Sequence, residues 1–288
     1  MAHITFGACS DAGRRNSTNH DAVFTLGAGE YEHLQGLFIV SDGMGKGLGS
    51  CTASKLTVQT LSCLLQSVLE QYDLGASTKV LAYGIREGMI EANRTLIEKK
   101  REFANIDLMG ATCVAVGISQ NTLVVGNAGD SRAYLLHEGE LRQITRDHIR
   151  LMPEGKRQGK QSGFTYIVAK GIGISPELEP EMEMMQIEEG DVILLCSDGL
   201  TGMVKDSEIT QILETTRTPQ EAASTLVECA NQHGGADNIS TIVVHYGTYT
   251  PKPRNQVSSA KEPDTQERGT LFSLFKKRRS IGAQERKS

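Results

Sequence analysis

The 288-residue sequence contains no tryptophan, and aromatic residues make up only 5% of it. A core must therefore be built from the aliphatic side chains that supply most of the 39% hydrophobic content. No apolar run approaches the ~18 residues that a membrane-spanning helix requires. The first residues show no basic start followed by a long apolar stretch, so no secretory signal is expected. These absences predict a globular protein in the cytoplasm.

Closely spaced cysteine pairs are also absent. The sequence has no Cys-x-x-Cys pair, and most of its cysteines lie inside apolar runs. The six are Cys9, Cys51, Cys63, Cys113, Cys196 and Cys229. Without close-set Cys or His pairs, a zinc site is not expected. We interpret the cysteines as buried, reduced thiols.

The net charge of −5 conceals an asymmetry along the chain. Residues 251–288 carry ten Lys or Arg and four Asp or Glu, so their net charge is about +6 and the rest of the chain carries about −11. An acidic body of this kind is not expected to bind nucleic acid, but it could hold cations.

The composition changes near residue 249. The stretch from residue 250 to 269 is rich in Pro, Ser, Lys and Glu, and it cannot bury enough apolar surface to fold alone. We therefore predict a folded domain over residues 1–248 and a flexible basic tail over residues 249–288. Residues 270–279 (TLFSLFKKRR) form a short amphipathic segment that could contact a partner groove or an anionic membrane surface. A disordered, solubilising tail is the alternative.

Periodicity predicts both strands and helices in the body. Helical spacing of apolar residues occurs at 50–70, 76–101, 205–213 and 218–232. Short β-rich runs occur at 3–8, 36–42, 111–118, 122–127, 132–136, 191–198 and 239–246. The tight turns between residues 117 and 136 predict a three-stranded antiparallel meander. Strands, then two long helices, then more strands indicate an α+β fold rather than repeated βαβ units.

Five aspartates border these apolar runs, namely Asp21, Asp42, Asp130, Asp198 and Asp237. Two stretches, LFIVSDGMG (37–45) and ILLCSDGLT (193–201), run an apolar strand into Ser-Asp-Gly. Carboxylates gathered in a desolvated site repel one another, and a hard divalent cation resolves that repulsion. Ligation by oxygen alone, to which the carbonyl of Gly43 could contribute, favours Mg²⁺ or Mn²⁺. For any one of these acids, an ordinary Asp-Gly turn is the alternative.

A set of motifs in a fixed order strengthens the metal interpretation. They are SDAGRRNSTNHDA, IVSDGMGKG, GATCVAVG, VGNAGDSRAYLL, ITRDH, LLCSDGL and GGADNISTIVV. The set, which spans residues 4 to about 246, resembles the type-2C metal-dependent serine/threonine protein phosphatases (PPM family) in their bacterial form. The resemblance implies a four-layer αββα sandwich of two antiparallel sheets flanked by helices, with a metal cluster at one end.

The resemblance also implies roles for individual residues. Asp42 matches the acid that bridges two metals, and Gly43 matches the backbone-carbonyl ligand. Asp198 and Asp237 match the other ligands of the first metal. Asp21 matches the acid that holds a metal-bound water, and Asp130 matches the ligand that, with Asp198, binds a third metal.

The implied catalytic residues are Asp21, Asp42, Asp198 and Asp237. The implied reaction is hydrolysis of phosphoserine or phosphothreonine in proteins by a water shared between two Mn²⁺ or Mg²⁺ ions, with a third ion at Asp130. Such an enzyme would be a monomer that reverses the action of a serine/threonine kinase.

The sequence departs from the family pattern where substrate phosphate is held. Asn16 occupies the position of the family arginine, and a neutral amide cannot replace a bidentate guanidinium. The candidate phosphate-binding residues are therefore Arg15, Arg14 and Lys46, although Lys46 could simply face solvent. Asn16 and Gly47, the latter in place of a family histidine, leave a pseudophosphatase or phosphopeptide-binding module as an alternative function.

A third chemistry is suggested by the spacing of Cys9 and Arg15, which is that of a cysteine-dependent phosphatase loop. Such a loop needs a helix N-terminus behind it to lower the pKa of the cysteine. Here polar NSTNHD follows, so Cys9 is interpreted as a residue at the end of the first strand. His148 is likewise interpreted as structural rather than as a general acid.

Overall fold

The structure is a computed structural model that describes residues 3–28, 34–45, 48–71, 78–102, 109–153 and 164–252. Three features named above fall outside these residues. They are Lys46, as a phosphate-binding residue, Gly47, in place of the family histidine, and the amphipathic segment at 270–279 in the tail. The division into a domain ending at residue 248 and a tail stays a prediction.

The larger sheet has the strand order β11–β6–β5–β3–β2, and all its pairs are antiparallel. Its strands are β2 (Asp21–Leu26), β3 (Gly36–Gly45), β5 (Cys113–Ser119), β6 (Thr122–Ala128) and β11 (Glu181–Gln186). The short β4 (Met109–Ala111) pairs with the end of β3.

The smaller sheet has the order β1–β13–β12–β7–β8, again antiparallel throughout. Its strands are β1 (Ile4–Asp11), β7 (Arg132–His137), β8 (Glu140–Gln143), β12 (Val192–Cys196) and β13 (Ile239–Tyr246). A separate hairpin pairs β9 (Ile149–Pro153) with β10 (Phe164–Val168).

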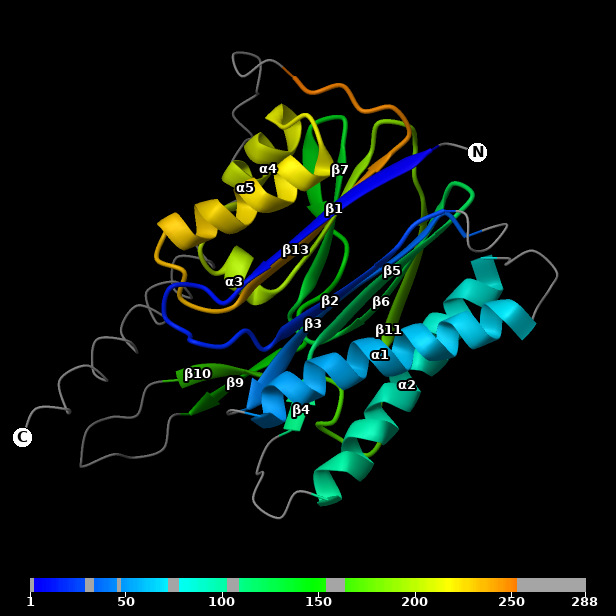
Figure 1. The fold of residues 1–288 in the computed structure, drawn as a ribbon, viewed down its shortest axis with the longest axis vertical. Helices are drawn as coiled ribbons and strands as arrows, with labels where there is room; N and C mark the ends of the chain where they lie inside the picture. Colours follow the sequence, from blue (N-terminus) through cyan, green and yellow to red (C-terminus); the bar gives the residue numbers. More distant parts are fainter. Residues whose placement is uncertain are drawn as a thin grey trace, which may run out of the picture.

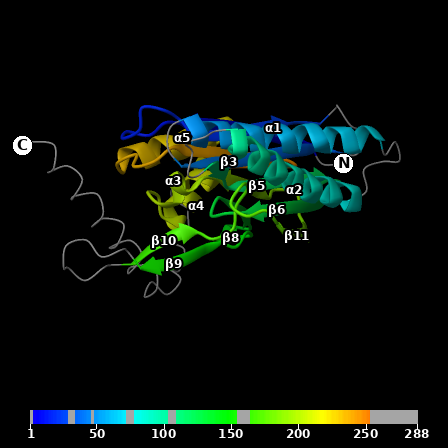
Figure 2. The same ribbon diagram turned by 90° about the horizontal axis from the view of Figure 1, so that it is seen from below.

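Helices cover the outer face of each sheet (Figures 1 and 2). The long helices α1 (Leu48–Gln71) and α2 (Thr78–Glu102) pack on the larger sheet. The smaller sheet is covered by α3 (Asp198–Thr201), α4 (Asp206–Thr215) and α5 (Pro219–Gln232). Two antiparallel sheets between two helical layers form the expected αββα sandwich, and this prediction is confirmed.

Three apolar layers hold the sandwich together because the central strands are apolar on both faces. In β3, Leu37 and Ile39 pack with the long helices, whereas Phe38 and Val40 pack between the two sheets. In β12, alternate residues likewise divide between the inter-sheet layer and the layer beneath α3–α5. Such unbroken apolar runs place whatever follows the strand at the rim of the core.

The predicted three-stranded meander over residues 117–136 is wrong in its third strand. β5 and β6 do pair as a hairpin, but β7 crosses to the smaller sheet and pairs with β12 and β8. The crossing turn contains Gly129 at φ +128°, where an added Cβ would lie 2.6 Å from Cβ of Thr112. Turn signals locate the ends of strands, but they do not say which sheet the next strand joins.

The inter-sheet layer should dominate stability. Leu195 in β12 is fully buried between the sheets. We predict that Leu195→Ala lowers the free energy of unfolding by about 2–5 kcal/mol, because it removes buried methyl groups and leaves a cavity. Met184→Ala on edge strand β11, where the side chain is 56% exposed, should change it by less than about 0.5 kcal/mol. Urea unfolding measures both, and equal losses would contradict this layering.

Candidate metal centre

The topology brings the five aspartates to strand ends and turns that meet at one end of the sandwich. Asp21 opens β2 and pairs in register with Asp42 of β3. Asp198 begins α3 directly after β12, and Asp237 lies two residues before β13. Asp130 lies in the turn where the chain crosses from β6 to β7. The two Ser-Asp-Gly stretches thus come from strands of opposite sheets.

Hydroxyl groups join these strand ends across the two sheets. Ser197 Oγ, just before Asp198, donates to Asp21 Oδ2 at 2.8 Å. Thr112 Oγ1 accepts from the backbone N–H of Asp42 at 3.0 Å and lies 2.6 Å from Ser131 Oγ in the Asp130 turn. The acids are therefore placed by a shared polar framework rather than by independent loops.

The electrostatics of the site oppose ionisation of Asp42 and Asp198. Burial raises the pKa of Asp42 well above its usual value, and the charges of Asp21, Asp198, Asp237 and Asp130 raise it further. Burial, followed by the charge of Asp130, likewise raises the pKa of Asp198 well above its usual value. Among the described residues, no three of these acids have carboxylate oxygens that all lie within 4.8 Å of one another. Mutual repulsion between the carboxylates favours this separation.

The residues present fit a hard divalent cation. Oδ1 of Asp21 and Oδ1 of Asp198 are buried and have no hydrogen-bond partner among the described residues. Buried, unpartnered carboxylate oxygens cost free energy that a bound cation would recover. At Gly43 an added Cβ would lie 2.1 Å from the carbonyl oxygen of Ser50, so only glycine allows the backbone this approach. The donor set contains only oxygen, which suits Mg²⁺ or Mn²⁺.

Asn238 is a residue of the candidate site that the sequence interpretation missed. Its Nδ2 donates to the carbonyl oxygens of Ala12 at 2.8 Å and Thr18 at 3.0 Å, and its Oδ1 accepts from the N–H of His20 at 2.9 Å. The buried amide thus fixes the β1–β2 loop beside Asp237. The sequence feature that could have identified Asn238 is its position directly after Asp237, in a Gly-Gly-Ala-Asp-Asn turn.

The same loop carries Arg14, Arg15 and Asn16, all of which are exposed. The backbone N–H of Arg14 donates to the carbonyl oxygen of Gly235 at 2.7 Å. Asn16 Nδ2 donates to Asp237 Oδ1 at 3.1 Å. Asn16, which stands where the resemblance implies an arginine, therefore contacts a candidate metal ligand, and the two arginines lie beside it in the chain.

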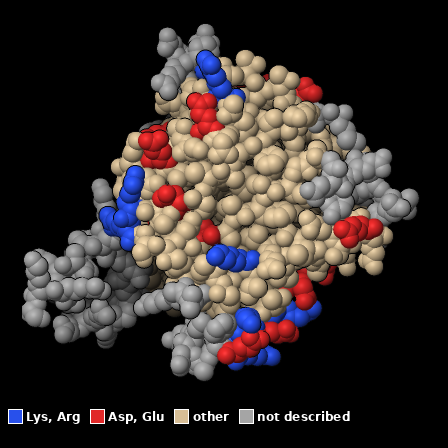
Figure 3. All heavy atoms as spheres, in the orientation of Figure 1, with Lys and Arg blue, Asp and Glu red and all other residues tan. Residues whose placement is uncertain are grey.

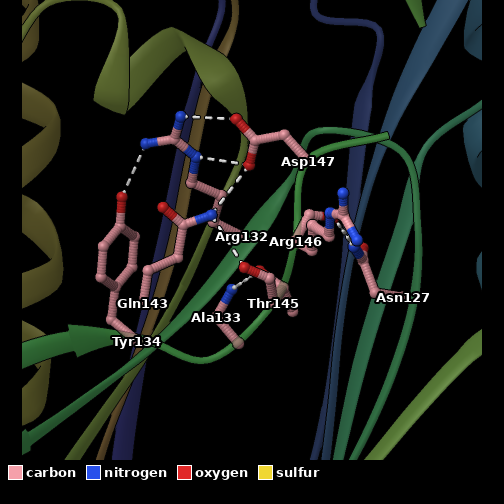
Figure 4. A network of polar contacts seen from close by, with 8 residues as sticks. All are labelled: Asn127, Arg132, Ala133, Tyr134, Gln143, Thr145, Arg146 and Asp147. Carbon is pink, nitrogen blue, oxygen red and sulfur yellow. Dashed lines mark hydrogen bonds and ion pairs between the residues drawn. The ribbon is translucent and has the colours of Figure 1, made fainter. Parts of the chain in front are cut away.

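A second framework supports the Asp130 turn (Figure 4). Arg132 forms two hydrogen bonds with the carboxylate of Asp147, at 2.8 and 2.6 Å, and a third with Tyr134 Oη at 2.8 Å. Asn127 Nδ2, from the other sheet, donates to the carbonyl oxygen of Arg146 at 2.9 Å. A bidentate arginine–carboxylate pair is geometrically specific, so the segment that follows β8 is held against both sheets.

His148 continues this framework. Its Nδ1 accepts from the N–H of Gly129 at 3.1 Å, and its Nε2 lies 2.7 Å from Glu181 Oε2. Both ring nitrogens are therefore engaged in positioning the turn before Asp130. This arrangement agrees with the structural role expected from the sequence.

The environment of Cys9 argues against a cysteine-dependent phosphatase loop. This residue lies within β1, opposite Thr241, and it packs against the apolar layer beneath α3–α5. Burial raises the pKa of its thiol, whereas a nucleophilic cysteine needs a lowered pKa. After Asp11 the chain forms a turn and not a helix, so this loop offers no helix N-terminus that would lower the pKa of the thiol.

Comparisons with known proteins agree with this geometry. The family model described as Stage II sporulation protein E (SpoIIE) matches residues 35–247. The chain is 32% identical over 242 residues to "Serine/threonine phosphatase stp" of Listeria monocytogenes, an alignment that covers 82% of this chain and 93% of that protein. It is 30% identical over 262 residues to "Serine/threonine protein phosphatase PstP" of Mycobacterium tuberculosis, covering 86% of this chain and 47% of PstP.

A solved structure shares the fold. The catalytic domain of PstP, in complex with two manganese ions, matches with a TM-score of 0.67 and 28% identity, over 86% of this chain and all of that domain. The chain therefore belongs to the PPM family of metal-dependent, type-2C serine/threonine protein phosphatases.

The raised pKa of Asp130 gives a test of the acid cluster. Burial, reinforced by the charge of Asp147, raises this pKa to about 6. A raised folded-state pKa stabilises the protein below about pH 4, and that stabilisation is lost as the pH rises through about 6. In the presence of a chelator, we compare the free energy of unfolding of Asp130→Asn with that of the unmodified protein. We predict that this difference shifts by about 2 kcal/mol in favour of Asp130→Asn when the pH is raised from about 4.5 to about 7.

Urea unfolding at the two pH values measures this difference. Glu183→Gln on β11, where the side chain is exposed, is the matched control. Its free energy of unfolding should change between the two pH values by the same amount as that of the unmodified protein. If the free energy of unfolding of Asp130→Asn also changes by the same amount as that of the unmodified protein, Asp130 ionises as freely as a surface carboxylate.

Proposed function

We propose that this protein is a Mn²⁺- or Mg²⁺-dependent phosphatase that removes phosphate from phosphoserine and phosphothreonine in proteins. The observation that carries the proposal is the gathering of five aspartates at one end of the sandwich, two of them with buried, unpartnered oxygens. Membership of the PPM family supplies the reaction class.

The metal ligands are proposed as follows. Asp42, Asp198, Asp237 and the carbonyl of Gly43 would hold two core ions, and Asp130 with Asp198 would hold a third. Divalent cations bound here would lower the pKa of a coordinated water and offset negative charge on the phosphoryl oxygens. No covalent phosphoenzyme is required, so none of the cysteines takes part.

Asp21 is placed to act on the attacking water. Its Oδ2 accepts from Ser197, which restrains the carboxylate, and its backbone N–H donates to Asn19 Oδ1 at 3.0 Å, which restrains the main chain. Its Oδ1 has no partner among the described residues and is available to accept a hydrogen bond from a water in the cluster. In this role Asp21 orients the water for attack on phosphorus.

Substrate phosphate is proposed to bind on the β1–β2 loop. Arg15 and Arg14 are the cations nearest in sequence to the residue that contacts Asp237, and Lys46 is a further candidate. Asn16 is a donor but carries no charge, and its amide is already directed at Asp237. We therefore propose that Arg15 supplies the charge that the family arginine would supply.

The retained acids oppose the pseudophosphatase alternative. Each buried carboxylate raises the free energy needed to ionise its neighbours, so a protein without metal chemistry would be more stable without them. Asn16 weakens phosphate binding in this account but leaves the metal ligands intact.

The remaining proposals concern the cellular setting. We propose a monomer in the cytoplasm that acts on phosphoproteins and opposes a serine/threonine kinase, with a partner or membrane contact made by the basic tail. Among the described helices, none is long and apolar enough to cross a membrane. On the face shown in Figure 3, acidic and basic side chains are intermixed. Nucleic acid is not among the proposed partners.

Metal and residue dependence test the reaction class. We predict that hydrolysis of a phosphoserine peptide requires Mn²⁺, is abolished by chelator, and falls at least about 100-fold in Asp198→Ala, since a group that orders charge at the reacting centre is lost. Cys9→Ser should retain activity. Metal-independent activity that disappears in Cys9→Ser would contradict the metal-dependent mechanism. Inactivity of the folded protein under every condition would favour a binding module.

Arginine dependence tests the proposed phosphate contact. We predict that Arg15→Ala raises KM for the peptide about 10-fold, because one charge-assisted hydrogen bond to phosphate is lost. Arg94→Ala on α2, whose side chain is 63% exposed and paired with Glu91, is the control and should leave KM unchanged. Equal KM values in both variants would remove Arg15 from the phosphate site.

A further inference from the structure

A second cluster of metal-binding side chains lies between α4 and α5. It consists of Glu208 in α4, Cys229 in α5 and His233 immediately after α5. One ligand atom from each lies within 4.8 Å of the other two, and among the described residues this is the group of three that meets this spacing. Cys229 and His233 are four residues apart, so a helical turn brings them to one face.

The orientation of His233 favours a ligand. Its Nδ1 lies 3.1 Å from the carbonyl oxygen of Met203, which can only accept, so Nδ1 must carry the hydrogen. In the neutral imidazole, Nε2 then presents a lone pair toward the cluster. A metal-binding histidine is commonly held by this kind of bond from its other nitrogen to a backbone carbonyl.

The spacing between His233 and Glu208 is that of two ligands rather than of a hydrogen-bonded pair. Nε2 and Glu208 Oε1 are 3.7 Å apart, which is too long for a hydrogen bond. Two ligands on a tetrahedral zinc ion, with bonds of about 2.0–2.3 Å, lie about 3.3–3.8 Å apart. Glu208 Oε2 is turned away, toward the backbone N–H of Lys205 at 3.5 Å.

We propose that Glu208, Cys229 and His233 form a zinc site, separate from the aspartate cluster, whose fourth position is open to water or an added ligand. Thiolate and imidazole select Zn²⁺ over Mn²⁺ and Mg²⁺, the reverse of an oxygen-only site. Glu208 and Cys229 are half-buried and His233 is exposed, so an ion can enter from solvent. The proposal does not depend on the phosphatase function.

Binding must release a proton. Burial, together with the charge of Glu208, raises the pKa of the Cys229 thiol, so the thiol is protonated near neutral pH. Zinc would form a bond to sulfur as the S–H bond breaks, and the proton leaves to solvent. The ion would also fix the end of α5, from which residues 234–237 lead to Asp237.

Cobalt substitution in the full chain tests this site, with excess Mg²⁺ present to fill oxygen ligands. We expect one Co²⁺ per chain with a cobalt–thiolate charge-transfer band, which zinc then displaces. The band should be absent in Cys229→Ser, and cobalt affinity should fall at least about 10-fold in His233→Gln. Cys63→Ser, at an exposed cysteine of α1, should retain the band. Thermal melts establish that each variant is folded.

A measurement on the unmodified protein keeps the test independent of variants. Alkylation of Cys229, followed by peptide mass spectrometry, should slow by about 10-fold or more with zinc at saturation, whereas alkylation of Cys63 should not change. The proposal is overturned if no thiolate band forms, if the band persists in Cys229→Ser, or if zinc leaves alkylation of Cys229 unchanged.

Discussion

Mutual repulsion among partly buried carboxylates is the constraint on which the rest of this structure depends. Asp42 is the centre of that repulsion, because the charges of all four other aspartates raise its pKa. A fold can hold such acids together only if their backbone is rigid and a cation is available to offset their charge. The strands β3 and β12 supply the rigidity, since the apolar run of each is buried on both faces and leads into a Ser-Asp pair.

Polar contacts transmit that rigidity to the loops. Asn238 binds three backbone groups of the β1–β2 loop, and Ser197 joins Asp21 to the end of β12. The Arg132–Asp147 pair and His148 do the same for the turn that carries Asp130. Because the contacts of Ser197 and His148 join elements of the two sheets, the site is a property of the whole sandwich rather than of one motif.

Much of the fold could be predicted from the sequence, because strands and long helices leave periodic signals. The expected helix at 218–232, for example, coincides with α5, which begins at Pro219 after the capping residue Thr218. The five acids were also visible, because each borders an apolar run. The place of β7 in the smaller sheet was not, since the Gly129 turn is equally suited to a hairpin and to a crossing.

Contacts between distant residues account for what the sequence could not indicate. The bond from Asn16 to Asp237 joins residues far apart in the chain. Glu208 and the Cys229–His233 pair meet only because α4 packs beside α5. No local sequence pattern predicts such contacts, because they form only when the helices and strands pack together.

Anomalous scattering at the manganese edge, from crystals grown with Mn²⁺, is the most direct measurement of the central claim. The account predicts two strong peaks at the end of the sandwich, in contact with Asp42, Asp198 and Asp237, with Asp42 touching both. Manganese peaks found only at sites away from these three aspartates, or a metal-free aspartate cluster in crystals of an active, manganese-saturated enzyme, would contradict it.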